Sequence, residues 1–454
     1  MERVGGEQAG QITSVRKVAL ASLVGTTIEW YDYFIYGTTA ALVFGQLFFP
    51  GYTELEGTLA AFATFAVGFF ARPLGGIIFG HFGDKIGRKT MLVLTLFLMG
   101  GATFLIGLLP SVETIGIWAP ILLVTLRIVQ GLGLGGEWGG AALMVSEHAP
   151  HNRRGFYASS VQMGAAGGLL FSGAAIAAVT AFTTEAQFAA WGWRIPFLAS
   201  IILVAVGLFI RFQIAESEAF MQLKEAGAEA QMPIIDVFRA RPKNVFLAAG
   251  VSGANNVVFY TVSVFTISYG VSQLGQAQGT MLTYQLITAG VYFFTLPLFG
   301  ALSDRIGRRE LIMASVVLMA LFAFPYFWLA STGNGLVILL AMVLALAVFQ
   351  SAAYAPQSAF IPELFDTRVR YSGASLGYNL ATMIFGGTSP FIATALFAWA
   401  GENTWAVSLY VIAVCVISFV SIVLATETPM LSESYDKDSE QRASPSGPSR
   451  EVPG

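Results

Sequence analysis

Twelve long apolar runs, separated by short polar connections, constrain the fold of this chain more than any other feature of its sequence. A helix needs about 20 apolar residues to cross a hydrocarbon core roughly 30 Å thick, and most of the runs reach that length. Charged residues make up only 11% of the 454 residues and the mean hydropathy is +0.68, so too few charges exist to coat soluble domains. The sequence therefore predicts an all-α membrane protein with twelve transmembrane helices. The predicted spans are residues 18–44, 57–79, 90–109, 117–146, 156–183, 194–213, 244–270, 277–300, 310–330, 334–361, 371–398 and 404–425.

The runs fall into two groups of six that repeat each other. GHFGDKIGRKT at 80–90 recurs as GALSDRIGRRE at 300–310, and EHAPHNRRGFYAS at 147–159 is similar to ELFDTRVRYSGAS at 363–375. Two duplicated six-helix halves related by pseudo-symmetry explain both pairs of similar segments. The expected organisation is an N-terminal tail at 1–17, a first half at 18–213, a central linker at 214–243, a second half at 244–427 and a disordered tail at 428–454.

The distribution of basic residues predicts the orientation in the membrane. Lysines and arginines cluster in the N-terminal tail, in the central linker and after the second, fourth, eighth and tenth spans, whereas the opposite connections GYTELEG, PSVETIG and ASTGNG contain none. Basic segments stay on the cytoplasmic side of a membrane. We therefore expect a multi-pass protein of the cell membrane with both termini and the central linker in the cytoplasm, contacting the lipid bilayer as a monomer.

Composition argues against several other functions. The net charge of −3 provides no basic stripe for nucleic acid, and a single cysteine, Cys415, excludes an intramolecular disulfide. The histidines at 81, 148 and 151 all lie in short polar connections and not on one helical face, so no metal site is expected. No nucleophile and base pair and no cofactor-binding loop is apparent, which predicts neither a cofactor nor an enzymatic activity.

The doubled motif G-x-x-x-D-(R/K)-x-G-R-(R/K) resembles the signature of the major facilitator superfamily. Further segments, GTTIEWYDYFIYG, ARPLGGIIFGHFGDKIGRK, LRIVQGLGLGGEWGGAALM, WGWRIPF and ESEAF, are similar to those of its metabolite:proton symporters, and the fourth-span segment is closer to the shikimate permease side of that group. This resemblance implies the major facilitator fold, alternating access to a central site, and a small-molecule substrate carried with protons. It also implies gating roles at one side of the membrane, with charge that merely sets topology as the alternative. The implied gating residues are Gly80, Asp84, Arg88, Lys89, Asp304, Arg308 and Arg309.

Two acids in the first span are candidates for proton coupling. Glu29 and Asp32 lie three residues apart, with Tyr33 and Tyr36 at the next helical positions, so all four share one face. Two partly buried carboxylates this close do not both ionise easily, as a proton-coupling site requires. The alternative is that they accept hydrogen bonds in every state and only hold the bundle together.

Arg127 in the fourth span is the best single candidate for binding an anionic substrate. An arginine stays charged and presents a planar fork that suits a carboxylate, although a permanent salt bridge to Glu29 or Asp32 is an alternative role. Glu137 lies further along the same span and is expected to be structural or gating, while Arg72 in the second span is expected to be structural. The other candidate substrate-binding residues are Gln130, Tyr33, Tyr36, Asn255, Asn256, Tyr260, Gln350 and Tyr354.

Together these features predict a proton-coupled symporter that brings a small organic acid into the cell. The acid could be shikimate-like, a di- or tricarboxylate, or aromatic. The first alternative is a symporter of a zwitterionic osmoprotectant such as proline or betaine, with Tyr33, Tyr36 or Tyr260 meeting the ammonium. The second is a transporter-like receptor that binds a metabolite without moving it.

Overall fold

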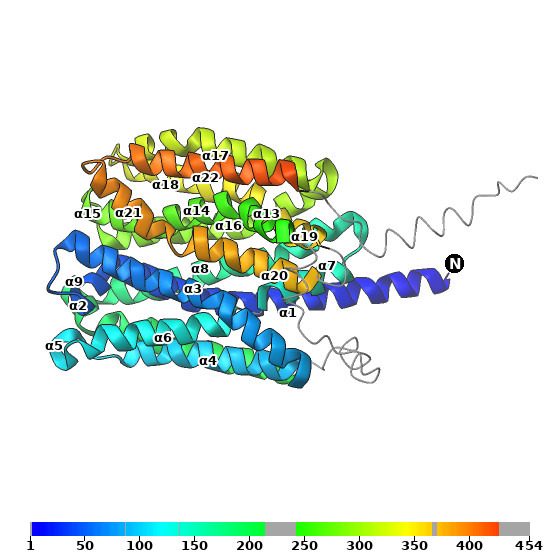
Figure 1. The fold of residues 1–454 in the computed structure, drawn as a ribbon, viewed down its shortest axis with the longest axis horizontal. Helices are drawn as coiled ribbons and strands as arrows, with labels where there is room; N and C mark the ends of the chain where they lie inside the picture. The colour runs from blue at the N-terminus through cyan, green and yellow to red at the C-terminus, as the bar shows by residue number, and fades with distance from the viewer. Residues whose placement is uncertain (1, 87, 136, 214–241, 366–369, 426–454) are drawn as a thin grey trace, which may run out of the picture.

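A computed structural model of the protein describes residues 2–86, 88–135, 137–213, 242–365 and 370–425. These residues form a bundle of helices that run roughly side by side along its long axis (Figure 1), and no strand occurs among them. Inside a bilayer each backbone N–H and C=O must be satisfied within its own segment, which favours helices for such apolar runs. The predicted all-α membrane fold is confirmed.

The first half of the chain supplies six spans, of which the first, fourth and sixth are built from consecutive shorter helices. Their bounds are α1 (Glu2–Thr39), η1 (Ala40–Phe44), α2 (Gly45–Phe48), α3 (Glu54–Ile86), α4 (Arg88–Leu108), α5 (Val112–Ile115), α6 (Trp118–Leu134), α7 (Glu137–His148), η2 (His151–Arg153), α8 (Arg154–Phe182), α9 (Glu185–Gln187), η3 (Phe188–Gly192) and α10 (Arg194–Gln213).

The second half repeats this layout, and three of its spans contain π-helical turns, which are frequent at functional sites. The bounds are α13 (Pro242–Val251), α14 (Gly253–Tyr260), η4 (Thr261–Phe265), α15 (Thr266–Ser272), α16 (Gln278–Ile306), α17 (Arg308–Ala330), α18 (Gly335–Val343), η5 (Leu344–Gln350), α19 (Ser351–Glu363), α20 (Arg370–Ala381), η6 (Thr382–Gly386), α21 (Ser389–Trp399) and α22 (Trp405–Leu424).

Most of these spans satisfy a length and apolarity test for crossing a membrane. Within the described residues nine helices pass it, or ten if the bent pair Glu185–Gly192 and Arg194–Phe209 is one span. Of the remaining two, α1 carries the polar stripe with Glu29 and Asp32, and α4 contributes the shorter apolar run Val93–Leu108.

The structure describes the N-terminal residues from Glu2, only the end of the predicted linker and none of the predicted C-terminal tail. Helix α1 begins at Glu2, so residues 2–17, assigned above to a tail, continue the first helix. The predicted linker lies outside the described residues except for Pro242 and Lys243, with which α13 begins. The predicted C-terminal tail at 428–454 lies wholly outside them.

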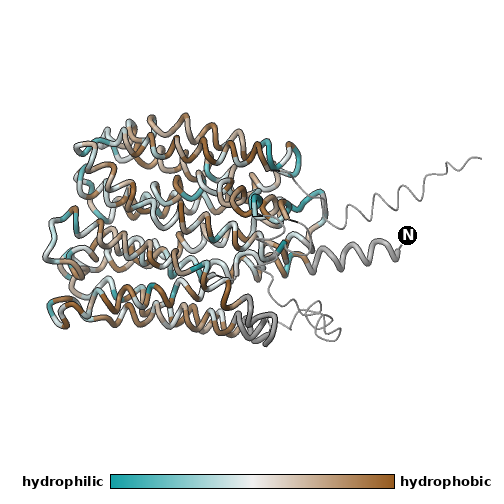
Figure 2. Tube along the Cα trace, in the orientation of Figure 1, coloured by the Kyte–Doolittle hydropathy of each residue, from teal (hydrophilic) through white to brown (hydrophobic). Residues whose placement is uncertain are grey.

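Apolar side chains cover the sides of the bundle. In Figure 2 the outer helices are brown along most of their length, whereas teal gathers at the two ends. Large apolar residues such as Phe97, Phe294 and Leu321 are exposed on these sides. Such a surface is unfavourable in water and matches the hydrocarbon of a bilayer.

The two halves meet along extended helix contacts. Helix α8 of the first half packs against α16 and α19 of the second, and α3 packs against α20 and α21. Within the first half, glycines allow α3 and α6 to approach closely, because a Cβ on Gly131 would lie 2.0 Å from the carbonyl oxygen of Gly68. A Cβ on Gly135 would likewise lie 2.0 Å from the carbonyl oxygen of Arg72. This close approach brings the polar side chains of α3 and α6 together.

Candidate functional site

The polar stripe of α1 faces the interior of the bundle. Glu29 is 4% exposed, and Asp32 and Tyr33 are fully buried. Both carboxyl oxygens of Asp32 lack a hydrogen-bond partner, although the Thr103 hydroxyl lies beside them and donates to the Met99 carbonyl at 3.0 Å. The tyrosines are tied to α3, since the Tyr36 hydroxyl lies 2.6 Å from the Thr64 hydroxyl. A buried carboxylate in this state is costly when charged and is suited to binding a proton.

Arg127 lies fully buried on α6, beside the stripe. Its guanidinium donates to the carbonyl oxygen of Phe65 at 2.9 Å and to the side-chain oxygen of Gln130, and its Nε has no partner. Its central carbon lies 4.0 Å from the ring centroid of Tyr36 and 4.7 Å from that of Tyr33. No carboxylate lies within ion-pair distance of Arg127 in the described part of the chain, so the salt bridge to Glu29 or Asp32 considered above is not formed there.

Gln130 connects the arginine to the acid. Its amide nitrogen donates to the Thr103 hydroxyl at 2.8 Å and lies 3.5 Å from the backbone carbonyl oxygen of Asp32. Its oxygen accepts from Arg127. A single amide therefore joins the surroundings of the candidate proton site to the buried cation.

The predicted residues of the second half are buried and uncharged. Asn255, Tyr260 and Gln350 are each at most 3% exposed, and each has a side-chain polar atom without a partner. The Tyr260 ring packs on Phe65 and Phe69 of α3, with centroids 5.8 and 5.5 Å away. The remaining two are engaged within the second half: the Asn256 amide donates to the Ser252 carbonyl oxygen at 2.9 Å, and the Tyr354 hydroxyl lies 3.2 Å from that of Tyr378.

Several residues at the contact between the halves were not predicted from the sequence to have a role there. Trp138 of α7 stacks on Tyr378 of α20 with centroids 3.8 Å apart and planes 8° from parallel. Asn379 donates to the Gly135 carbonyl oxygen at 2.5 Å, which adds a polar contact between the same regions. Arg72, expected to be structural, is 1% exposed and lies among aromatic rings from both halves. Arg72 could have been identified from the sequence as a charge within an apolar run. No sequence pattern distinguishes Trp138 and Tyr378 from other aromatic residues.

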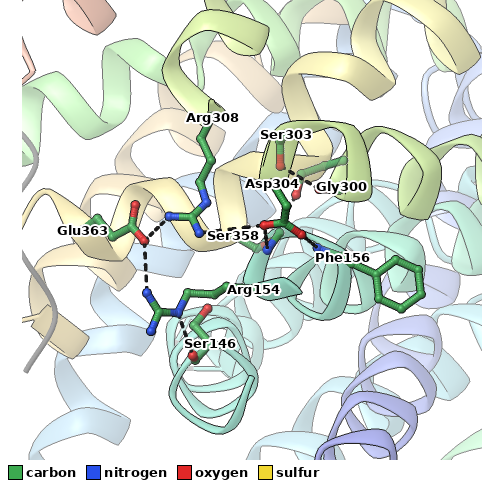
Figure 3. Close-up of polar contacts among 11 residues, drawn as sticks. Ser146, Arg154, Phe156, Gly300, Ser303, Asp304, Arg308, Ser358 and Glu363 are labelled. Atoms are coloured by element: carbon green, nitrogen blue, oxygen red, sulfur yellow. Dashed lines mark hydrogen bonds and ion pairs between the residues drawn. The ribbon is translucent and has the colours of Figure 1, made fainter. Parts of the chain in front are cut away.

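The second copy of the repeated motif joins the halves at one end of the bundle (Figure 3). We call this the basic end; it is where the visible N-terminus projects in Figure 1. The Asp304 carboxylate, on α16, accepts hydrogen bonds from the backbone amides of Gly155 and Phe156 at 2.7 and 2.9 Å. These amides begin α8, where the helix dipole favours an anion. A charge-assisted contact of this kind can be made in one conformation and broken in another.

Two further charges complete this cluster and were missed from the sequence. Glu363, at the end of α19, accepts from Arg308 and lies 3.9 Å from Arg154, which belongs to the first half (Figure 3). Arg308 also lies 3.9 Å from Asp304 within its own half. Arg309 instead donates to the Val423 carbonyl oxygen at 2.6 Å, a contact inside the second half.

The first copy of the motif stays a prediction. Gly80 lies in α3, and Arg88 and Lys89 begin α4, but the side chains of residues 80–92, including Asp84, lie outside the described part. The side chain of Glu137 also lies outside it, and its backbone begins α7.

Comparisons with known proteins fit this architecture. The model of the major facilitator superfamily matches residues 22–384. The chain is 42% identical over 419 residues to the shikimate transporter of Escherichia coli strain K12, covering 92% of this chain and 96% of the relative. It is 32% identical to the proline/betaine transporter of the same organism, covering 91% and 84%.

Solved structures show the same fold. A crystal structure of a D-xylose-proton symporter superposes with a TM-score of 0.68 at 17% identity, covering 91% of this chain and 97% of that one. A partially occluded inward-open structure of a xylose transporter from E. coli gives a TM-score of 0.70 at 16% identity, covering 91% and 98%. The chain therefore belongs to the major facilitator superfamily, whose members are membrane transporters and not enzymes.

Proposed function

We propose that this protein is a proton-coupled symporter that carries a small organic acid into the cell by alternating access. The observation that carries the proposal is Arg127, a fully buried cation at the centre of the bundle whose hydrogen-bond partners are neutral. A charge at such depth costs about 2.5 to 3.5 kcal/mol on insertion scales. A substrate carboxylate bound nearby would offset that cost.

In the proposed cycle, the acids of α1 bind the proton. When Asp32, with Glu29 as its neighbour, binds a proton and the site binds an acid, the central region carries less uncompensated charge. Because Gln130 touches both Arg127 and the backbone of Asp32, the two events act on one hydrogen-bond network. The loaded carrier then changes conformation more readily than the empty, deprotonated one.

The basic end is proposed to face the cytoplasm, which follows from the excess of lysine and arginine there. The contacts of Asp304, Arg154 and Glu363 between the halves would then close the cytoplasmic side. Opening would separate these charged groups and expose the central site to the cell interior.

Similarity supports an acid as the cargo, since the shikimate transporter is 42% identical and the proline/betaine transporter 32%. Geometry supports it as well. The zwitterion alternative needs a free aromatic face for the ammonium group. The Tyr33 and Tyr36 rings already lie under Arg127 at 4.7 and 4.0 Å, and the Tyr260 ring packs against Phe65 and Phe69.

Uptake into proteoliposomes tests the proposal. Labelled shikimate, 2-oxoglutarate, citrate, an aromatic acid and betaine are supplied with and without an imposed inward proton gradient. We expect gradient-stimulated uptake of an acid, lost in Arg127→Ala and kept in Arg194→Ala. Arg194 is a matched control because it stacks on Trp193 away from the centre and donates to the carbonyl oxygen of Gly107 at 3.1 Å. Uptake of betaine alone, or uptake indifferent to the gradient, would contradict the proposal.

A further inference from the structure

Arg72 has no role in the function proposed so far, yet it is as deeply buried as Arg127. It lies on α3, 18 residues after Glu54, which places it about 27 Å along the helix and far from either end. The side chain is 1% exposed, so the guanidinium does not reach the membrane surface. The Nε and Nη1 atoms have no hydrogen-bond partner. A guanidinium with unsatisfied donors at this depth is unfavourable unless something else supplies acceptors.

Aromatic rings surround Arg72 without supplying those acceptors. Its central carbon lies 5.7 Å from the ring centroid of Trp30, 5.9 Å from Tyr33 and 5.5 Å from Phe69, all in the first half. Tyr378 of the second half lies 5.9 Å away. Cation–π contacts stabilise the charge in part, but they leave the in-plane N–H groups unbonded. A purely structural role therefore leaves the two nitrogens unexplained.

Arg72 and Arg127 form a pair of cations around Tyr33. Their central carbons lie 5.9 and 4.7 Å from the centroid of that ring. The close approach of α3 and α6 at their glycines brings the two arginines together. Within the described residues neither forms an ion pair with a carboxylate. Two unpaired cations near the same ring create a local field that favours an anion.

The second half offers a different chemistry across the interface. Its sequence has no lysine or arginine at 244–304, 310–367 or 371–425, so the basic residues that the structure describes in this half lie near the basic end. Apart from Arg308 at the basic end, the described buried groups with unpartnered polar atoms there are neutral, including the hydroxyls of Tyr260 and Tyr292 and the amide of Gln350. Such groups bind hydroxyls well and provide no counter-charge for a second carboxylate.

We propose that Arg72 binds the substrate carboxylate directly, and that the neutral polar groups of the second half bind hydroxyls on the same molecule. The inference rests on the proposed function and narrows its cargo to a hydroxylated monocarboxylic acid. Arg72 donates from Nε and Nη1, Arg127 adds its field and its free Nε, and Tyr378 places the bound acid against the second half. Binding at Arg72 thereby connects the two halves through the substrate.

Counterflow without a proton gradient tests this binding role. Proteoliposomes of the full chain, loaded with unlabelled shikimate, take up labelled shikimate, and the half-saturation concentration is measured. Losing one partner of a buried charged pair weakens binding at least about 30-fold, so Arg72→Gln should raise that concentration by this factor or more. Arg72→Lys keeps the charge with fewer donors and should fall between Arg72→Gln and the wild type. Arg194→Gln, which removes a ring-stacked arginine far from the site, should leave it unchanged.

Competition by unlabelled 2-oxoglutarate and betaine tests the substrate class, and both should compete more weakly than shikimate. Wild-type counterflow with an unchanged half-saturation concentration in Arg72→Gln would overturn the role of Arg72 while leaving the proposed function intact. Stronger competition by 2-oxoglutarate than by shikimate would overturn the monocarboxylate assignment. If the wild type exchanges no acid at all, the proposed function itself fails and this inference with it. Should Arg72→Gln not reach the membrane, an Arg72→Lys protein with wild-type half-saturation and wild-type selectivity would refute the need for the arginine fork.

Discussion

Adding one methyl group at Gly139 should shift the protein away from the conformation in which the basic end is closed. Gly139 lies on α7 of the first half and faces Ser375 on α20 of the second. A Cβ there would lie 1.9 Å from the Ser375 Oγ, 3.0 Å from its Cβ and 3.2 Å from its Cα. The hydroxyl can rotate away, but the two carbons move only if α20 moves.

The size of the effect follows from this overlap. Carbon atoms pack at about 3.5 to 4.0 Å, so α20 must retreat by a few tenths of an ångström or more. Overpacking of this kind typically costs about 1 to 3 kcal/mol. Because the clashing atoms belong to opposite halves, the clash destabilises only the closed conformation and is absent when the halves separate. The open population should therefore rise about 5- to 150-fold in Gly139→Ala.

Alkylation of a buried cysteine measures that population. Ser358 is fully buried at the interface, where its hydroxyl donates to the Ala158 carbonyl oxygen of the first half at 2.8 Å. In a Cys415→Ser background, Ser358→Cys should react with a maleimide mainly when the basic end opens, so its rate follows the open fraction. We expect Gly139→Ala to raise this rate by the same 5- to 150-fold.

The control is Gly101→Ala, because a Cβ on Gly101 meets nothing within 4 Å. It should leave the alkylation rate unchanged while making the same chemical substitution within a membrane helix. A rate in Gly139→Ala within twofold of the Gly101→Ala rate would refute the reasoning that closure at the basic end depends on this contact.

Asp32→Asn should keep counterflow of the acid but lose gradient-driven accumulation, because the amide cannot bind and release the proton. Glu113→Gln, which changes an exposed acid, is the control. Continued accumulation in Asp32→Asn would exclude this carboxyl from coupling. Asp304→Asn weakens two charge-assisted hydrogen bonds to α8, each worth about 1.5 to 3 kcal/mol. The alkylation rate of the Ser358→Cys reporter should therefore rise at least tenfold. An unchanged rate would contradict a gating role for Asp304. In intact cells, a cysteine at Glu113 should react with an impermeant maleimide and one at Lys17 should not, and the reverse pattern would invert the proposed orientation.

The fold was predictable because it depends on local properties of the sequence. Apolar runs of membrane-spanning length predict helices, and the GHFGDKIGRKT and GALSDRIGRRE repeats place the boundary between the two halves. The burial of Glu29, Asp32 and Arg127 was also predictable, since charged residues within apolar runs face the interior of a bundle. Helix α1 was harder, because residues 2–17 are polar and nothing in their pattern distinguishes a continuing helix from a tail.

The partners of these residues were decided only by the tertiary structure. Sequence spacing left open a salt bridge between Arg127 and an acid of α1, whereas the folded chain places Gln130 and the Phe65 carbonyl oxygen there. The sequence predicted only a structural role for Arg72, and its position among rings depends on how α1, α3 and α20 pack together.

The same holds for the contacts between the halves. The stack of Trp138 on Tyr378 and the approach of Arg154 to Glu363 join residues far apart in the chain. Hydrophobic periodicity reports which face of a helix is buried, but the choice of partner depends on helix crossing and side-chain packing across the whole bundle. The sequence by itself determined which residues are buried in the membrane, and the packing of the two halves determined what each of them contacts.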